Sequence, residues 1–256
     1  MSEDVKFEID GAVAIITLNR PQKLNAVTPE MADAIVAAVT ECNDSNTIRC
    51  VILTGAGERA FCAGSDIREL DTYETPWQFR NRPDYCDAFR ALLKPSIAAV
   101  NGYAFGGGLE TAMSCDIRIA SENAQFAAPE IKLGWIGGGG MAAHLVHSIG
   151  GSNAALMIMT GDPISAEKAE RWGLVSEVVP QADLLKRARE IADVIASRAP
   201  IAAETAKLNL KAAASMPLEK AIEYERDLQT ICFATADAQE GRAAFKEKRA
   251  PFFKRR

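Results

Sequence analysis

Short apolar runs alternate with helical patterns over the first two-thirds of the chain. The runs lie at 12–19, 49–55, 96–102 and 117–121, and they are rich in Val, Ile and Ala. Continuous apolar runs of this length are typical of strands that are buried on both faces. Because helical stretches separate them, the order strand–helix–strand predicts a parallel sheet with crossover helices.

Two helix starts are marked by their residues. Thr28 has the character of an N-cap, with Pro29 at the first helical position and Glu30 in the first turn, and this helix is expected to reach about Asn43. A second helix is expected to begin in the glycine run 106–108. The polar segment from about 70 to 94 has no clear pattern.

The pattern changes after Ser165. A strand-like piece at 174–179 is followed almost only by helical stretches, at 184–199, 201–214, 218–234 and 238–248, which Pro200 and Pro217 interrupt. We find no internal repeat and no low-complexity linker. The expected organisation is one α/β core, residues 1–195, with a helical region at 196–256.

Composition and charge exclude some partners. The 256 residues are 48% hydrophobic and 25% charged, as in a globular protein with a full core, and the net charge of −5 gives no overall attraction to nucleic acid or to an anionic membrane. The C-terminal stretch KEKRAPFFKRR is locally basic. It is either a patch for an anionic ligand or a solvated tail.

The six cysteines form no CxxC pair and no zinc-type spacing, which predicts buried free thiols in a reducing compartment. The N-terminal stretch MSEDVKFEID lacks the pattern of a signal peptide, and no apolar run approaches the length of a membrane span. We therefore expect a cytoplasmic protein that does not bind membranes.

Glycines follow two of the apolar runs, in AFCAGSDI (60–67) and NGYAFGGGLE (101–110). Glycine permits a sharp turn, and amides at a helix start lack intrahelical partners, so one N–H from each loop could hold an oxygen that gains charge. Glycine after a strand is more often only a turn, and the spacing alone leaves both interpretations open.

Two glutamates strengthen the catalytic interpretation. Glu110 is expected in the first turn of the helix that begins in the glycine run, and Glu130 follows Pro129 in a segment with few other charges. Glu110 alone would complement the helix dipole, and Glu130 alone would cap a helix or join an ion pair. Together they indicate a base and an acid that share one pocket.

The chain resembles the crotonase, or enoyl-CoA hydratase/isomerase, superfamily over almost its whole length. The matching stretches are VAIITLNRPQKLNAVTPEM, GERAFCAGSDIREL, KPSIAAVNGYAFGGGLETAMSCDIRIAS, AQFAAPEIKLG, ISAEKAERWGLVSEVVP and EGRAAFKEKRAPFFK. The resemblance implies the ClpP/crotonase-like α/β fold of repeated ββα units, with a C-terminal helical trimerisation region. It also implies a homotrimer or a homohexamer.

The resemblance also assigns site residues. It implies that the N–H groups of Ser65 and Gly107 form an oxyanion hole and that Glu110 and Glu130 are catalytic. Members with both glutamates are typically hydratases or dehydratases, whereas isomerases usually keep one. The implied CoA-binding residues are Lys23, Leu24, Ala26, Ala63, Ser65, Asp66 and Ile67.

The implied activity is hydration of a trans-2-enoyl-CoA, with an acyl-CoA as the small-molecule partner and no metal or redox cofactor. Another crotonase reaction (double-bond isomerisation, carnitinyl-CoA dehydration or thioester hydrolysis) is the alternative. A non-catalytic member that binds acyl-CoA or RNA is a third.

The chain departs from the common family pattern in two places. GWIGGGGM (134–141) replaces a run that contains proline, so Trp135 and the glycines are expected to alter the acyl pocket. The segment 71–91 matches nothing firmly. Its aromatic residues Trp77, Phe79 and Tyr85 are expected either to line the acyl pocket or to pack in the core.

Other catalytic motifs are absent from the sequence. Ser65 lacks the G-x-S-x-G setting of a hydrolase nucleophile, so its amide is the expected working part. His144 and His147 share a helix face but have no nearby carboxylates, so a structural or surface role is expected rather than a metal site. The chain has neither a Walker A motif nor a complete G-x-G-x-x-G, which argues against NTP and NAD.

Overall fold

The computed structural model describes residues 3–256 and contains a six-stranded sheet in the order β1-β2-β3-β5-β7-β10. Neighbours from β2 to β10 are parallel, and only β1 is antiparallel to its neighbour. The strands are β1 (Val5–Asp10), β2 (Val13–Leu18), β3 (Cys50–Gly55), β5 (Ser96–Val100), β7 (Ile117–Ser121) and β10 (Glu177–Val179). The predicted parallel sheet is confirmed, β1 was not anticipated, and β10 is shorter than the expected strand.

A second sheet, in the order β4-β6-β8-β9, was not foreseen. Its strands have only two or three residues each, too few for a periodic pattern: β4 (Ala60–Cys62), β6 (Tyr103–Phe105), β8 (Gln125–Ala127) and β9 (Ile164–Ser165). Each of β3, β5 and β7 leads into one strand of this sheet and then into a helix. The expected repeat of ββα units is thereby confirmed.

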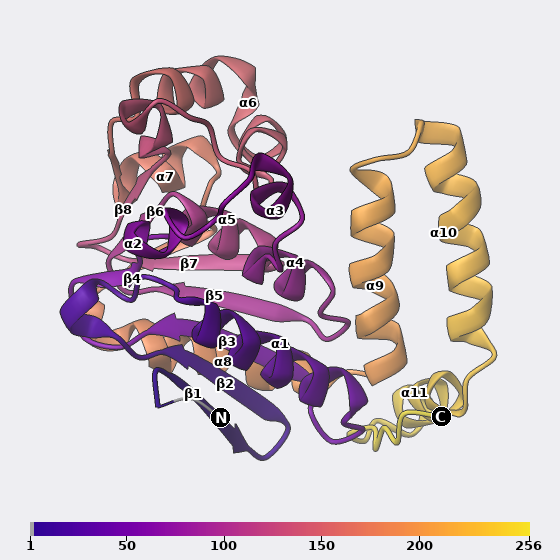
Figure 1. Ribbon diagram of the computed structural model, residues 1–256. Coiled ribbons are helices and arrows are strands. Elements are labelled where there is room, and N and C mark those ends of the chain that lie inside the picture. The colour runs from indigo at the N-terminus through magenta and orange to yellow at the C-terminus, as the bar shows by residue number, and fades with distance from the viewer. Residues whose placement is uncertain (1–2) are drawn as a thin grey trace.

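Helices cover both faces of the larger sheet (Figure 1). On one face, α8 (Leu184–Ala196) places Leu184, Ala188 and Ala192 against buried strand residues such as Ile52 and Ile97. The other face belongs to the main core, to which α1 (Pro29–Asp44), α4 (Tyr85–Arg90), α5 (Gly107–Ser114) and α6 (Met141–Thr160) contribute. Burial on both faces explains why the strands read as unbroken apolar runs.

Side-chain caps define helix starts that the sequence showed in part. The Thr28 hydroxyl accepts a hydrogen bond from the Met31 N–H at 3.3 Å, and Pro29 begins α1, as predicted. In the segment without clear pattern, Asp66, Thr75 and Asp84 cap three short helices: α2 (Ile67–Leu70), α3 (Pro76–Arg80) and α4. Local capping rather than periodic burial organises this stretch.

The C-terminal helices α9 (Pro200–Ala213) and α10 (Leu218–Phe233) form a pair that stands beside the core, and α11 (Ala236–Glu247) lies across its base (Figure 1). Two buried lysines join α9 to the sheet. Lys94 lies 2.9 Å from Glu204, and Lys207 lies 2.8 Å from Asp116. The predicted division between 1–195 and 196–256 stays a prediction.

The remaining elements are α7 (Ala166–Trp172), η1 (Pro21–Lys23), η2 (Pro129–Leu133) and η3 (Gln181–Asp183).

The basic C-terminal stretch is folded back onto the helices rather than free. The Asp237 carboxylate accepts hydrogen bonds from the N–H groups of Lys254 at 2.7 Å and Arg255 at 2.8 Å. The Arg255 guanidinium also pairs with Glu204 on α9. The end of the chain is therefore anchored to α11, although most of its residues remain exposed to solvent.

All six cysteines are free, and five of them are buried. Burial raises the pKa of Cys42, Cys50, Cys62 and Cys115 to about 12, so these thiols stay protonated, as the sequence suggested. Within residues 3–256, every helix is too short or too polar to cross a membrane.

Candidate active site

Two glycine turns, one from each sheet-to-helix connection, lie in contact. A Cβ at Gly64 would lie 3.1 Å from the Gly107 nitrogen and 3.2 Å from the Phe105 carbonyl oxygen. Gly64 has a φ of 96° and Gly106 a φ of 55°, values that favour glycine. The close approach brings the loop after β4 against the start of α5.

Two backbone amides at this contact have no partner. No acceptor within residues 3–256 receives a hydrogen bond from the N–H of Ser65 or of Gly107. Gly107 is the first residue of α5, where an amide lacks an intrahelical acceptor and the helix dipole favours negative charge. The structure therefore places both predicted oxyanion amides together with their donors free.

Glu110 projects from the first turn of α5 into a nearly closed site and is only 5% exposed. Its Oε1 accepts hydrogen bonds from the N–H groups of Gly139 at 2.7 Å and Met141 at 3.0 Å. Its Oε2 accepts none within the described residues, and a Cβ at Gly139 would lie 2.7 Å from it. One carboxylate oxygen is held in place while the other remains open for chemistry.

The four-glycine run therefore packs against Glu110. A Cβ at Gly137 would lie 2.8 Å from Oε1 of that glutamate, as close as the Cβ at Gly139 would lie to Oε2. We expected these glycines to alter the acyl pocket, and the structure shows that two of them make room for a carboxylate.

Glu130 lies in η2, which follows β8 at the same edge of the smaller sheet as the loops after the parallel strands β4 and β6, and its side chain faces the turn at Gly106. A Cβ at Gly106 would lie 2.9 Å from its Oε1. Its Oε2 is buried and has no hydrogen-bond partner among the described residues. An unpartnered buried carboxylate oxygen costs stability and is typical of a functional site.

The two carboxyl groups have different surroundings. Burial raises the pKa of Glu110, hydrogen bonds from Met141 and Gly139 oppose that rise, and the charge of Glu130 adds to it. Burial also raises the pKa of Glu130, which only its own backbone N–H opposes. Burial thus favours the protonated form of both carboxyl groups, and two backbone N–H groups support the charged form of Glu110.

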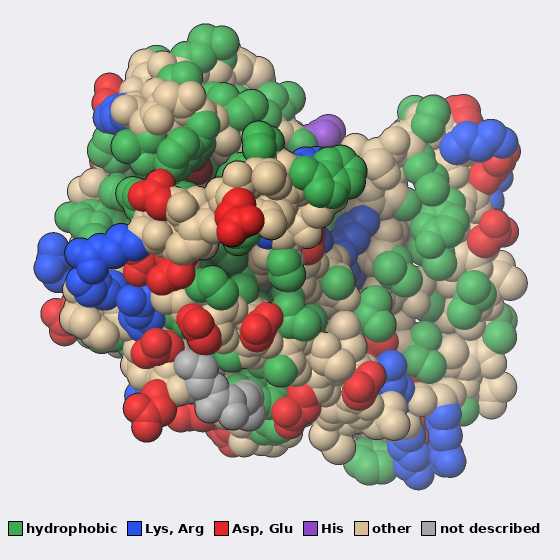
Figure 2. Space-filling view, in the orientation of Figure 1, with side chains coloured by type: hydrophobic (Ala, Val, Ile, Leu, Met, Phe, Trp, Pro, Cys, Tyr) green, Lys and Arg blue, Asp and Glu red, His purple; other side chains and the backbone are tan. Residues whose placement is uncertain are grey.

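The predicted CoA-binding residues come from two segments that lie side by side. The Val27 N–H donates to the Gly64 carbonyl at 2.9 Å, and the Ala63 N–H donates to the Leu24 carbonyl at 3.0 Å. This pairing brings together Lys23, Leu24 and Ala26 from one segment and Ala63, Ser65, Asp66 and Ile67 from the other. In Figure 2, Lys and Arg side chains gather on the side where the β2–α1 connection lies.

Asp66 fixes this loop rather than facing the carboxylates. Its side chain caps α2 and accepts from both terminal nitrogens of Arg20 at 3.3 Å. Arg20 also donates to the Ala26 carbonyl at 2.7 Å, so one guanidinium bridges the two segments.

The aromatic residues of the segment 71–91 and Trp135 separate into two groups. Trp77 is 75% exposed, and Phe79 and Trp135 are also exposed, so packing in the core is excluded for these three. Trp135 follows η2 after Gly134, and its N–H donates to the Glu130 carbonyl at 3.2 Å. Tyr85 is buried in the core. A role of Trp77, Phe79 and Trp135 in the acyl pocket stays a prediction.

Three residues of the site escaped the sequence analysis or its functional assignment. Asn25 has a φ of 56°, and its buried side chain donates to the carbonyls of Ala56 and Ala60. Arg90 donates to the Gly139 carbonyl at 2.5 Å. The Tyr85 hydroxyl lies 3.2 Å from the Ser65 hydroxyl. Of these three residues, only Asn25 could have been singled out from the sequence, because it is a polar residue between the apolar Leu24 and Ala26.

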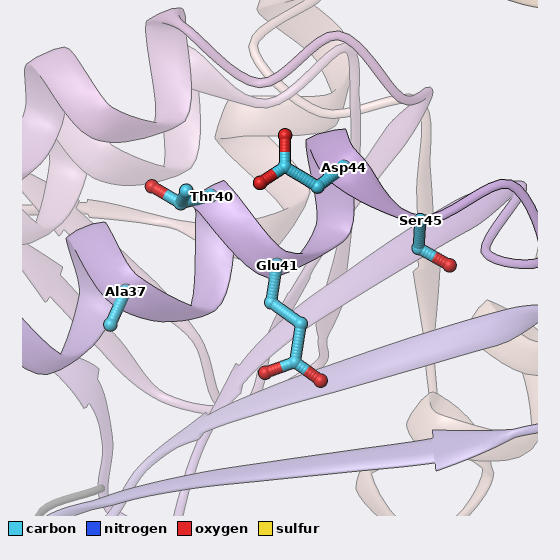
Figure 3. A pocket seen from close by; sticks show the side chains of 5 residues that line it. All are labelled: Ala37, Thr40, Glu41, Asp44 and Ser45. Carbon is cyan, nitrogen blue, oxygen red and sulfur yellow. The ribbon is translucent and has the colours of Figure 1, made fainter.

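Other candidate sites have no link to these residues. Within residues 3–256, no group of three or more His, Cys, Asp or Glu side chains is placed to hold a metal. A depression along α1 is lined by Ala37, Thr40, Glu41, Asp44 and Ser45, whose side chains point in different directions (Figure 3). His144 packs beside Gly140, and burial lowers its pKa, whereas His147 is exposed.

Comparison with known proteins agrees with this geometry. Residues 8–256 match the family Enoyl-CoA hydratase/isomerase. A probable enoyl-CoA hydratase of Mycobacterium bovis is 43% identical, with 99% of each chain covered. The short-chain-enoyl-CoA hydratase of Clostridium acetobutylicum is 40% identical, with 96% of this chain and 95% of the relative covered.

Solved structures give the same result. The crystal structure of an enoyl-CoA hydratase from Bacillus anthracis superposes with a TM-score of 0.92 at 36% identity, covering 99% of this chain and 100% of that one. The match over residues 8–256 and identity at this level over nearly complete chains show that this chain belongs to the enoyl-CoA hydratase/isomerase family.

Proposed function

We propose that this protein is an enoyl-CoA hydratase, which reversibly adds water to a trans-2-enoyl-CoA to give a 3-hydroxyacyl-CoA. One observation carries the proposal. Two glutamates from different elements meet beside the glycine turn at the start of α5: Glu110, buried in the first turn of that helix, and half-buried Glu130 in η2, whose Oε1 faces Gly106 and whose charge acts on Glu110. Hydration requires an acid and a base beside an oxyanion site.

The amides activate the substrate. The N–H groups of Ser65 and Gly107 donate to the thioester oxygen, which draws electron density from the conjugated double bond. These bonds strengthen as the oxygen gains enolate character, so they favour the transition state over the bound substrate.

The surroundings of the glutamates divide the remaining work. Glu110, whose charge two backbone N–H groups support, acts as the base. It takes a proton from a water molecule while the oxygen of that water bonds to the β-carbon. Glu130, whose Oε2 has no donor among the described residues, acts as the acid and delivers a proton to the α-carbon. The product gains one proton and one hydroxyl, the atoms of one water, and the proton held by Glu110 returns to Glu130 before the next turnover, so the atoms balance without a metal or a redox cofactor.

The paired segments 20–27 and 63–67 supply the binding site for coenzyme A in this proposal. Basic side chains on that side of the molecule suit the anionic phosphates of the ligand (Figure 2). The exposed apolar side chains of the C-terminal helices, Phe233 and Phe245 among them, suit association with further copies of the chain as a trimer or hexamer.

Loss of the conjugated thioester absorbance of crotonyl-CoA tests the proposal. The wild-type protein should bleach the signal, and Glu110→Gln and Glu130→Gln should each lower kcat by about 100-fold or more. Glu219→Gln, at the start of α10, is the matched control and should keep full activity. A wild-type protein that binds crotonyl-CoA but leaves its absorbance unchanged would show that the chain is a binder and not a hydratase.

The same variants separate hydration from isomerisation. An isomerase that relied on Glu130 alone would retain most of its activity in Glu110→Gln. Retention of activity in that variant, measured as migration of the double bond in a 3-enoyl-CoA, would replace the proposal by the isomerase alternative.

A further inference from the structure

The hydroxyl of Tyr85 lies at the oxyanion turn although its residue is far from both glycine loops in sequence. It lies 3.2 Å from the Ser65 hydroxyl, on one wall of the site. It also occupies the space beside Gly107, since a Cβ on that glycine would lie 2.1 Å from the Tyr85 oxygen. Gly107 is therefore needed for the tyrosine as well as for the turn.

A count of protons shows that this pair of hydroxyls has a donor to spare. Ser65 and Tyr85 carry one O–H each, and their mutual hydrogen bond uses only one. Neither hydroxyl has another hydrogen-bond partner among residues 3–256. One O–H beside the two free amides therefore lacks an acceptor in the protein.

The phenol is the better donor of the two. A phenol is more acidic than an alcohol, so the Tyr85 hydroxyl donates the stronger hydrogen bond. The Ser65 hydroxyl can rotate to donate to the Tyr85 oxygen or to accept from it. Tyr85 is 7% exposed, and burial raises its pKa well above the usual value, so it keeps its proton. Its ring packs in the main core, which limits the movement of the hydroxyl.

We propose that Tyr85 is a third oxyanion donor, whose O–H binds the thioester oxygen beside the amides of Ser65 and Gly107. The inference rests on the proposed function. In the complex, the Ser65 O–H turns to donate to the Tyr85 oxygen, and the Tyr85 O–H donates to the substrate. Ser65 thus contributes its amide to the substrate and its side chain to the position of Tyr85.

Tyr85→Phe removes one oxygen and keeps the ring. We expect kcat for crotonyl-CoA hydration to fall by about 10- to 100-fold with little change in KM, because the bond strengthens with the developing charge. Ser65→Ala, which keeps the backbone amide, should lower kcat by a smaller factor. Tyr224→Phe, on α10, is the matched control and should match the wild type.

The carbonyl stretch of bound butyryl-CoA, labelled with carbon-13 at the thioester carbonyl, reports on the donor directly. This saturated thioester cannot be hydrated. The stretch should shift to lower frequency on binding to the wild type and should shift less in Tyr85→Phe. The thermal unfolding midpoint identifies any loss of activity that comes from unfolding.

The results distinguish the two proposals. A wild type that hydrates crotonyl-CoA and a Tyr85→Phe variant with unchanged kcat and an unchanged carbonyl shift would overturn the role of Tyr85. Lost activity with an unchanged carbonyl shift would also overturn it, because the loss would then be structural. A wild type that shifts the carbonyl but does not hydrate crotonyl-CoA would overturn the hydratase assignment alone.

Discussion

The backbone N–H of Gly139 donates a 2.7 Å hydrogen bond to Oε1 of Glu110, and the α-carbon of the same glycine faces Oε2. One residue of a glycine run thus touches both oxygens of a buried carboxylate. Because Glu110 is the proposed catalytic base, this relationship leads to the first prediction.

Gly139→Ala should lower kcat/KM for crotonyl-CoA by at least about 10-fold, because its Cβ would lie 2.7 Å from Oε2 of Glu110 and displace that side chain. Gly138→Ala is the matched control, since a Cβ at 138 has no neighbour within 4 Å. Equal activity of the two variants would contradict the role assigned to Gly139.

Arg90 should hold the glycine run 137–140 in position. Its guanidinium donates to the Gly139 carbonyl at 2.5 Å, so Arg90→Leu should loosen the residue that holds Glu110 and lower kcat by about 10-fold, with a smaller effect on KM. Arg90→Lys should recover part of the loss. Arg198→Leu, a change at an exposed arginine just beyond α8, serves as control. A rise in KM without a fall in kcat would show that Arg90 acts in substrate binding instead.

Glu130→Gln should be at least as stable as the wild type at pH 7.5, although we expect it to lose activity. Burial raises the pKa of Glu130, so the folded protein holds this proton more tightly than the unfolded chain does. Stability is therefore lost as the pH rises from the unfolded value through the raised folded value. Glutamine cannot ionise and avoids this cost.

Urea unfolding at several pH values from 4.5 to 8 measures this effect. The stability advantage of Glu130→Gln over the wild type should grow as the pH rises and should vanish at the acidic end. A variant that is less stable than the wild type at pH 7.5 would show that the charged carboxylate has a partner that stabilises it.

Asn25 should connect stability to CoA binding. Its side chain is fully buried and donates to the carbonyls of Ala56 and Ala60, at 3.0 and 2.7 Å. Asn25→Ala should lower the free energy of unfolding by about 2–4 kcal/mol, because it removes the donor to the Ala56 carbonyl, one of two donors to the Ala60 carbonyl and the acceptor of the Arg20 N–H. It should also raise KM for crotonyl-CoA, because the pairing of the two segments proposed to bind CoA weakens.

Asn25→Gly separates the side chain from the backbone. Glycine tolerates the φ of 56°, so this variant should lose about 1 kcal/mol less than Asn25→Ala while its KM rises as much. Urea unfolding and initial rates measure the two effects. An unchanged KM in both variants would show that Asn25 has a role in folding alone.

The sequence by itself determined β2, β3, β5 and β7 of the larger sheet and the starts of α1 and α5. Unbroken apolar runs such as 49–55 report burial on both faces, and Thr28 followed by Pro29 reports a helix start, because both patterns depend on neighbouring residues only. The glycines and glutamates of the site were also found from the sequence. The family resemblance added their roles, which single residues did not carry.

Only the tertiary structure decided which atoms meet. The smaller sheet has strands too short for a periodic pattern, so its existence depends on pairing with distant segments. The bonds from Gly139 to Glu110, from Lys207 to Asp116 and between Tyr85 and Ser65 join residues 20 to 91 positions apart. Local patterns contain no information on such contacts, because the path of the whole chain sets the distances between their atoms.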